Sequence, residues 1–186
     1  HVQQRGNYDI PGNRGIYLRG HNLTVENCAI EYSAGPGIKM GLVGTENDHS
    51  PNNNPSNVRI ENNLIRYVDY YGTYAAGINV CMEDGGKILR NTISHTGRSS
   101  INISCGGGYH YPGRYALEVK YNRLHDGMIT SSDGGLVYLY GVANLGTEFA
   151  CNWLYNNHNP AGSILYLDGG GGWEWVIHHN VFWMKD

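Results

Sequence analysis

The chain has 186 residues, enough for one domain with a sizeable core, and it is rich in glycine and tyrosine, with 27 Gly and 15 Tyr. Its 16 Asp and Glu outnumber its 13 Lys and Arg, and this acidic balance argues against a nucleic-acid partner. Helix-forming residues are scarce and no apolar run is long enough to cross a bilayer, so the composition excludes a helical bundle and predicts no membrane partner.

Six segments of the chain repeat one pattern, in which an alternating apolar pair precedes a small polar residue and another apolar residue follows two places later. In chain order they are residues 23–32, 58–67, 86–95, 117–126, 148–156 and 175–183. The shared polar position is occupied by Cys28, Asn63, Asn91, Asn122, Asn152 and Asn180. Successive positions lie 28 to 35 residues apart, which is too short for a strand–helix–strand unit, and the strict alternation predicts strands.

A second family of predicted strands lies between these segments, at residues 37–40, 77–82, 100–105, 135–140 and 163–168. Two or three short strands per repeat, stacked in parallel, predict an all-β fold, a right-handed parallel β-helix of about six coils that forms one domain over residues 1–186. We expect the asparagines to form a ladder, because asparagine tolerates a left-handed bend and its amide can hydrogen-bond the same amide one coil away.

Three motifs carry a family resemblance, namely "LEVKYNRLHD", "SSDGGLVYLYG" and "SILYLDGGGGWEWVIHHNVFW". With the repeats, they resemble the right-handed β-helix proteins of the pectate-lyase-like superfamily. More narrowly, residues 126–183 are similar to β-helix glycoside hydrolases of the family 141 type, which are fucosidases and xylanases. The resemblance implies a carbohydrate-active protein, most simply a glycoside hydrolase acting on plant or microbial polysaccharide or oligosaccharide. The chain is far shorter than that family, so we expect a fragment whose ends another domain or subunit covers.

Acids, glycines and aromatic residues gather after the second family of strands, at residues 83–86, 106–114, 140–141 and 168–172. Stacked along one edge of the solenoid, they describe a sugar-binding groove. The resemblance implies Asp168 and Asp133 as the catalytic pair, with Glu83 as the fallback partner. We expect the substrate-binding residues to be Asp84, Tyr109, His110 and Tyr140. The alternative interpretation is that these acids only form turns, although four glycines after Asp168 exceed what a turn needs and suggest clearance for a ligand.

The predicted geometry bears on which carboxylates act together. A straight strand separates Asp133 from Asp168 by about 16 Å, beyond the roughly 5–10 Å of retaining and inverting pairs. Glu83 is expected two coils from Asp168, at about 4.8 Å per coil, which lies near the inverting separation. In either pair one carboxyl group must stay protonated, so we expect one of them to have a raised pKa.

Two other functions compete with hydrolysis. A polysaccharide lyase needs Ca²⁺ or cations and a Lys or Arg base, and the outward positions on the groove side read Lys39, Asn79 and Asn102, with Arg98 and Arg114 in loops. This basic lining is thin, so the lyase ranks below the hydrolase. The other alternative is a fibre, adhesin or glycan-binding solenoid without catalysis.

The four cysteines lack the close pairing typical of zinc sites, so we expect no metal and no cofactor, Ca²⁺ excepted if the protein is a lyase. The simplest interpretation of all four is as small buried hydrophobic residues. Cys81 and Cys105 could be bridged if their strands are neighbours, and such a bridge fits an oxidising compartment. We therefore expect an extracellular or periplasmic protein.

Overall fold

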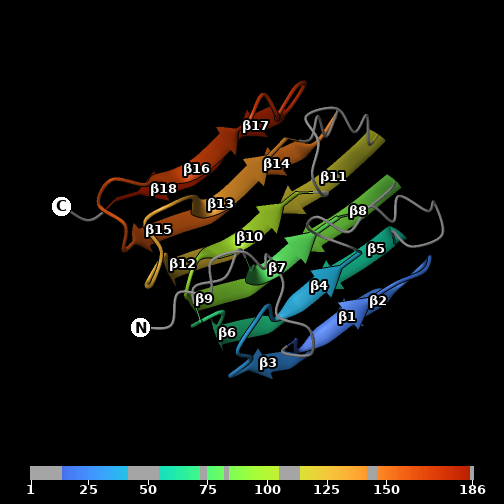
Figure 1. Ribbon diagram of the computed structural model, residues 1–186. Helices are drawn as coiled ribbons and strands as arrows, with labels where there is room; N and C mark the ends of the chain where they lie inside the picture. The colour runs from blue at the N-terminus through green and yellow to red at the C-terminus, as the bar shows by residue number, and fades with distance from the viewer. Residues whose placement is uncertain are drawn as a thin grey trace.

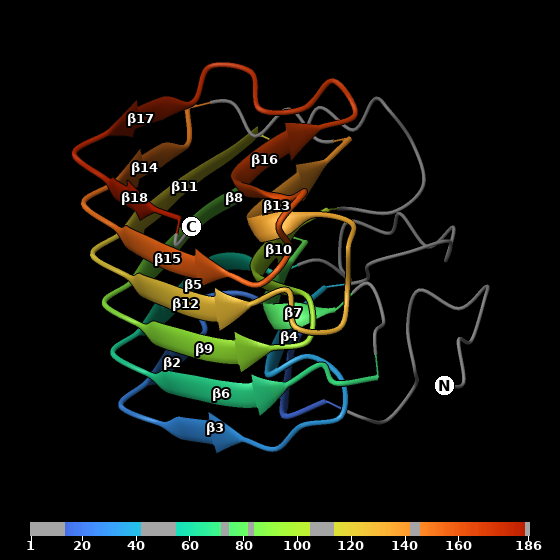
Figure 2. The same ribbon diagram turned by 90° about the vertical axis from the view of Figure 1, so that its left-hand side faces the viewer.

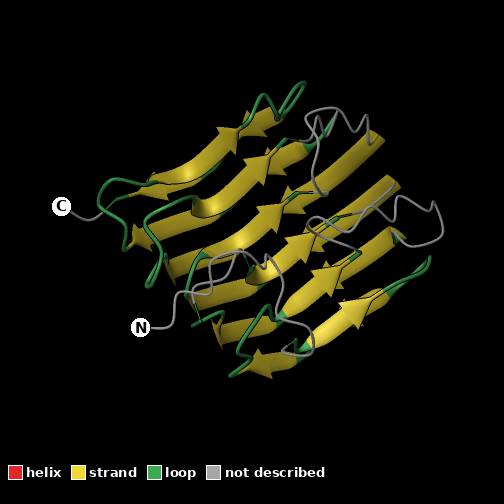
Figure 3. Ribbon diagram, viewed as in Figure 1, coloured by secondary structure: helices red, strands yellow, loops and turns green. Residues whose placement is uncertain are grey.

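The computed structural model describes residues 14–41, 55–71, 75–81, 84–104, 114–141 and 146–184. In these residues every regular element is a strand, and the strands form three six-stranded parallel sheets, as predicted (Figures 1 and 3). The chain visits one strand of each sheet in turn and then repeats, so that the three sheets build a solenoid of six coils (Figure 2). The described residues contain no helix long and apolar enough to span a membrane.

We name the sheets by the order in which each coil visits them. Sheet A contains β1 (Ile16–Leu18), β4 (Ile38–Met40), β7 (Ala76–Val80), β10 (Ser99–Ile103), β13 (Gly135–Tyr140) and β16 (Ser163–Asp168). Sheet B contains β2 (Thr24–Glu26), β5 (Ser56–Glu61), β8 (Asp84–Leu89), β11 (Arg114–Lys120), β14 (Glu148–Ala150) and β17 (Val176–His178). Sheet C contains β3 (Ala29–Glu31), β6 (Leu64–Val68), β9 (Thr92–Thr96), β12 (Arg123–Gly127), β15 (Trp153–Asn157) and β18 (Val181–Trp183).

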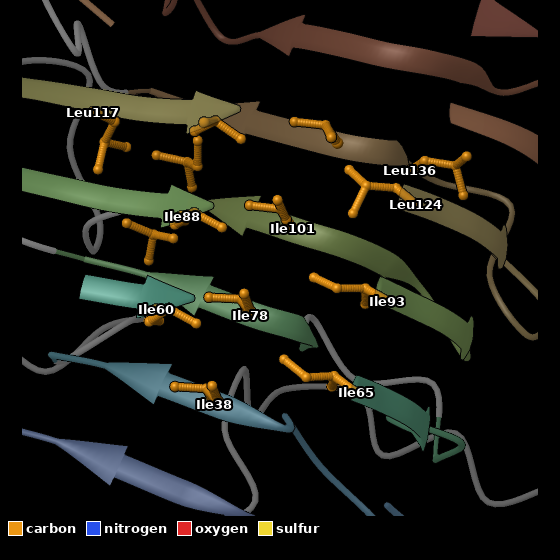
Figure 4. Close-up of a cluster of buried hydrophobic side chains, with 14 of the residues drawn as sticks. Ile38, Ile60, Ile65, Ile78, Ile88, Ile93, Ile101, Leu117, Leu124 and Leu136 are labelled. Carbon is orange, nitrogen blue, oxygen red and sulfur yellow. The ribbon is translucent and has the colours of Figure 1, made fainter. Parts of the chain in front are cut away.

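The core fills the inside of the solenoid with rows of aliphatic side chains (Figure 4). Alternate residues of each strand point inward, and the parallel register places like residues above one another. In sheet A, for example, Ile38 pairs with Ile78, and Ile101 pairs with both Ile78 and Val137. All four side chains are fully buried. Such burial stabilises the fold by about 1.5–3 kcal/mol per side chain, which explains why the inward rows are almost entirely aliphatic.

An asparagine ladder marks the turn between sheets B and C, as the repeat predicted. The backbone N–H and Nδ2 of Asn122 both donate to Oδ1 of Asn152, over 2.9 and 3.0 Å, and Nδ2 also donates to the carbonyl of Ile88 at 2.8 Å. The same pattern joins the other asparagines from Asn63 to Asn180. Each ladder amide therefore bonds backbone groups of the preceding coil and the amides of both neighbouring coils.

The left-handed bend of this turn lies one residue earlier than expected. The residues with positive φ directly precede the ladder positions, and they are Asn27, Asn62, Arg90, Tyr121, Cys151 and His179, with φ between 54° and 60°. The prediction that the ladder asparagines themselves take the bend was therefore wrong. Their side chains are selected for hydrogen bonding, whereas the strained backbone is carried by a residue of almost any type.

Candidate functional site

The outer face of sheet A carries a row of mixed polar and aromatic side chains, one from each coil. Strand register places them above one another in the order Tyr17, Lys39, Asn79, Asn102, Tyr138 and Tyr166. We call this set the sheet A row. Lys39, Asn79 and Asn102 therefore occupy outward positions, as the alternation predicted.

Several members of the sheet A row are buried although they face away from the core. Lys39 is fully buried, and Asn79 and Asn102 are only 3% and 2% exposed. Among the described residues, Oδ1 of Asn79 accepts no hydrogen bond. A buried polar atom without a partner costs about 1–3 kcal/mol, so this position is not optimised for the fold alone. The row therefore offers an unused acceptor beside a buried cation.

Asp168 lies at the end of β16 on the same face, and its carboxylate is surrounded by donors. The Tyr138 hydroxyl donates to Oδ2 at 2.8 Å and the Gly169 backbone N–H donates to Oδ1 at 2.6 Å. The Tyr166 hydroxyl also hydrogen-bonds this carboxylate. Three donors on one carboxylate hold it in a fixed orientation.

The two tyrosine hydroxyls are held in their protonated form. Burial raises the pKa of Tyr138 far above its usual range, and the hydrogen bond to Asp168 and the charge of that carboxylate add to the rise. The negative charge of Asp168 raises the pKa of Tyr166, together with burial and a hydrogen bond to the same carboxylate. Both phenols therefore remain donors at neutral and mildly alkaline pH.

Tyr140 is brought next to Asp168, as the sequence predicted for a substrate-binding residue. The register pairs Tyr140 with Asp168 across β13 and β16. Its ring lies nearly parallel to the ring of Tyr138, with centroids 6.4 Å apart and planes 11° apart, and it is exposed to solvent. An exposed, oriented ring beside a carboxylate is a surface on which the C–H face of a sugar can pack.

The glycine run after Asp168 has a backbone origin that differs from the expected clearance. Gly169, Gly170 and Gly172 have φ of 62°, 72° and 77°, a conformation that other residues adopt only with strain. A side chain at Gly169 would lie 2.8 Å from the ring of Tyr140, and one at Gly172 would lie 2.9 Å from Leu167. Of these three positions, only Gly170 has open space around it. Gly169, Gly170 and Gly172 therefore form a left-handed turn, Gly169 and Gly172 make room for Tyr140 and Leu167, and Gly170 leaves room for a ligand.

Asp133 lies at the other end of the same strand pair. Gly135, two residues after it, pairs with Ser163, which is five residues before Asp168 and so about 16 Å from it along the strand. The charge of Asp133 nevertheless acts on the hydroxyls of Tyr138 and Tyr166, which bond Asp168, so the side chains approach more closely than the strand positions do. Asp133 is exposed, and its carbonyl accepts a hydrogen bond from Nε of Arg98 at 2.9 Å.

Arg98 connects the two carboxylates indirectly. Its Nη2 lies 3.6 Å from the carboxylate of Asp133, and its guanidinium lies 4.4 Å from the centre of the Tyr138 ring, whose hydroxyl reaches Asp168. The Arg98 side chain is only 2% exposed, so this cation is held within the protein. Asp133 and Asp168 therefore belong to one chain of contacts that runs through Arg98 and Tyr138.

Four predicted residues cannot be placed as side chains. Glu83, Tyr109 and His110 lie outside the described residues, and Asp84 is described only as the first backbone position of β8. The expected two-coil separation between Glu83 and Asp168 was wrong, because β7 and β16 are three steps apart in the order β7-β10-β13-β16. At about 4.8 Å per step the two strands lie roughly 14 Å apart.

The sequence interpretation missed Arg98, Tyr138 and Tyr166 as site residues. The signal for both tyrosines was present, because the alternation in "GLVYLY" and "SILYLD" places each on the same face as the next polar residue two positions later. No comparable signal marks Arg98, since its burial depends on the ring of Tyr138 one coil away. The alternation of residues in a sequence does not show which side chains meet across neighbouring coils.

The cysteines divide into two classes. Cys81 is disulfide-bonded, whereas Cys28 and Cys151 are free. Cys105, the partner that the sequence suggested, lies outside the described residues. In the part of the chain that the structure describes, no three His, Cys, Asp or Glu side chains gather as metal ligands would.

Comparison with known proteins adds one match. The family model of the right-handed β-helix region matches residues 5–182, which is almost the whole chain. No curated protein and no solved structure matched the chain. The match therefore agrees with the three parallel sheets and supports the assigned fold.

Proposed function

The chain belongs to the right-handed β-helix family, and from this premise we propose that it is a carbohydrate-active protein whose glycan site is the outer face of sheet A at β13 and β16. The family fits the pectate-lyase-like superfamily generally. The more specific proposal is a glycoside hydrolase that acts on plant or microbial polysaccharide. The observation that carries it is the carboxylate of Asp168, held by two tyrosine hydroxyls beside the exposed ring of Tyr140.

In this proposal each residue around Asp168 has a separate task. The exposed Tyr140 ring packs against the C–H face of a sugar, as aromatic rings do in sugar sites. Tyr138 and Tyr166 fix the orientation of the carboxylate, so that it acts on the anomeric carbon as a nucleophile or activates a water as a base. The oxygen of the leaving sugar then needs a second, protonated carboxyl group. Among the described residues Asp133 is the candidate for that acid.

A glycan-binding solenoid without catalysis is the second candidate function. It is favoured by the positions along the strands, because Asp133 precedes β13 whereas Asp168 ends the paired strand β16, and a hydrolase pair spans only about 5–10 Å. A polysaccharide lyase is less well supported than either the hydrolase or the glycan-binding solenoid. Its basic groups on this face would be Lys39, which is fully buried, and Arg98, which is engaged with Asp133 and Tyr138.

The disulfide at Cys81 supports a location for this activity. Disulfides persist in oxidising compartments, and polysaccharides of other organisms are met outside the cell. We therefore propose an extracellular or periplasmic protein. Loss of a free-thiol signal at Cys81 in protein secreted by its own host would support this location, and a reduced thiol would contradict it.

The deciding experiment measures reducing sugar released from a panel of neutral plant and algal glycans. We expect Asp168→Asn to lower the rate at least about 100-fold, the usual effect of losing a catalytic carboxylate, while glycan binding persists. Asp133→Asn is measured beside it, because Asp133 is the candidate for the second carboxyl group, and an unchanged rate in this variant would remove Asp133 from the chemistry. An equal loss in Asp133→Asn identifies it as the second carboxyl group.

Three results would redirect the proposal. A rate unchanged in Asp168→Asn would remove Asp168 from the chemistry. Binding without any release of sugar by the wild-type protein would favour the non-catalytic solenoid. A product with the ultraviolet absorbance of an unsaturated uronate would favour the lyase.

A further inference from the structure

The outer face of sheet C exposes large aromatic side chains at its C-terminal end. In β15, Leu154 is fully buried, so Trp153 and Tyr155 on either side of it point outward. In the neighbouring strand β18, Trp183 pairs with Tyr155. Trp153 and Trp183 are 58% and 65% exposed, which is high for tryptophan, a residue that is mostly buried in soluble proteins.

Rings continue along this side of the solenoid through all six coils. His125 lies flat against Tyr155, with ring centres 4.7 Å apart and planes 2° apart, and His95 follows at 6.4 Å. Tyr67 lies 4.8 Å from His95, and it stacks on Tyr32 at 5.1 Å. We call the whole set the sheet C aromatic face, which consists of Tyr32, Tyr67, His95, His125, Trp153, Tyr155 and Trp183. Figure 2 shows the strands that carry it stacked from β3 to β18.

The charges beside the sheet C aromatic face are compensated. Glu31 and Arg66 form an ion pair next to the stacked Tyr32 and Tyr67. Arg123 donates from Nε to the Tyr155 hydroxyl at 2.6 Å, with its guanidinium 5.5 Å from the same ring centre, and keeps its positive charge. The same strand also carries the acid Asp126, so the charges named on this face balance in sign, which suits an uncharged ligand better than an ionic one.

Hydrogen bonds also hold the rings in place. Asp126 lies 2.6 Å from Nδ1 of His125 and 3.3 Å from Nε2 of His158, and Nδ2 of Asn156 donates to it at 3.2 Å. Together with the bond from Arg123, these contacts fix the orientation of His125 and Tyr155. Rings that are ordered before binding lose little conformational entropy when a ligand arrives.

Sheet B has the opposite character. Its outer face carries an alternating ladder of charges, in which Lys87 pairs with Glu118, Lys120 bridges Glu118 and Glu148, and Glu148 contacts His178. Surface charge of this kind is enough to keep a solenoid face soluble. The described exposed rings on sheet C therefore do not follow from the fold, and they mark an interaction surface.

We propose that the sheet C aromatic face docks the protein on extended, uncharged polysaccharide, apart from the site at Asp168. The exposed rings of Trp153 and Trp183 can pack on the C–H faces of sugars, whereas the rings that stack on one another between coils offer their edges to sugar hydroxyl groups. The sheet that carries these rings runs through all six coils. The choice of a glycan as the ligand rests on the proposed function. The surface itself lies on a different sheet from Asp168.

The test is cosedimentation with insoluble microcrystalline cellulose and with insoluble xylan as uncharged probes, and with a polygalacturonate gel as the charged probe. We expect the double variant Trp153→Ala, Trp183→Ala to lower the bound fraction on an uncharged probe at least tenfold. Tyr121→Ala removes an equally exposed ring outside the face, in the turn between β11 and β12, and is expected to bind as the wild type does. Circular dichroism and melting curves establish that each variant is folded.

The outcomes separate this proposal from the hydrolase. If Asp168→Asn loses activity but sediments normally, and the tryptophan variant sediments poorly but cleaves soluble oligosaccharide, both proposals stand. If no reaction is found for any variant but the tryptophan variant still loses retention, the docking surface stands alone. Unchanged sedimentation of the tryptophan variant, no binding by the wild type, or a dimer that only the tryptophan variant loses would overturn the docking surface.

Discussion

Two columns of side chains run the length of the solenoid, and they differ in how they repeat. At the turn between sheets B and C, five of six coils place an asparagine at the same position, and each amide bonds the next. In the sheet A row, the same one-residue-per-coil spacing holds tyrosine, lysine, asparagine and then tyrosine again. Both columns are largely buried, so exposure does not explain the difference.

The difference follows from what each column bonds to. An amide is complementary to another amide one coil away, so repetition of asparagine satisfies every turn of the stack with one residue type. The sheet A row has no such self-complementary pattern, and Oδ1 of Asn79 lacks a partner among the described residues although Asn102 is its neighbour. A uniform column meets a need of the coil, whereas the mixed column is not explained by bonding between coils, since it leaves a buried acceptor unused.

The largest expected effect comes from replacing one asparagine by leucine in each column and comparing the free energies of unfolding. Asn91→Leu should lower the free energy of unfolding by about 3 kcal/mol, because the Asn63 amide groups lose their acceptor and the Ile60 carbonyl loses its donor. Asn79→Leu should change it by less than about 1 kcal/mol in either direction, since no hydrogen bond of its Oδ1 is lost. Urea unfolding monitored by circular dichroism measures both.

Equal losses of stability at both positions would show that the sheet A row is structural as well. Asn79 is only 3% exposed and its strand β7 lies two steps from β13, so Asn79→Leu is expected to leave glycan binding at Asp168 unchanged.

The strands and the ladder were predictable because their signals are local and repeated. Alternation of apolar residues gives the strand and its inward face, and the asparagine positions give the length of each coil. The number of coils between Glu83 and Asp168 could also have been predicted correctly. The predicted strands from 77–82 to 163–168 are already three steps apart in the sequence.

The contacts of the site were less predictable, because they join residues about thirty positions apart through side-chain rotamers. Tyr138 meets Asp168 across one coil, and Arg98 meets Asp133 across another. The glycines after Asp168 illustrate the same limit, since the sequence shows that they are small but not that Gly169 and Gly172 have positive φ. A glycine can serve a left-handed backbone or leave space for a ligand. The backbone conformation and the side chains of neighbouring coils decide between these two reasons.

A test of intermediate size uses the raised pKa of Tyr138. Burial and Asp168 raise the pKa in the folded protein, so the proton stays on the phenol while the unfolded chain releases it near pH 10. The stability from this group is therefore complete below about pH 10 and declines as the pH rises further, by at most about 1.4 kcal/mol per pH unit. We expect Tyr138→Phe to flatten the decline between about pH 10 and 12, measured by urea unfolding at each pH.

The control for that decline is Tyr121→Phe, which removes an exposed tyrosine hydroxyl at the turn between sheets B and C. It corrects for the loss of one tyrosine from the unfolded chain. A decline in Tyr138→Phe as steep as in the wild type would mean that the hydroxyl of Tyr138 is not shielded beside Asp168. The raised pKa of Tyr138 would then no longer distinguish the sheet A row from the turn between sheets B and C.

The smallest expected effect comes from completing the uniform column at Cys28, the one described ladder position without an asparagine. The Cys28 backbone N–H already donates to Oδ1 of Asn63 at 3.0 Å, as the N–H groups of the other ladder positions do to the next asparagine. Cys28→Asn adds an Nδ2 donor to the same oxygen, so we expect a gain of about 0.5–1 kcal/mol and a melting temperature a few degrees higher by calorimetry. Cys28→Ala is the control, and equal stability of the two variants would mean that amide repetition no longer stabilises the exposed end of the ladder.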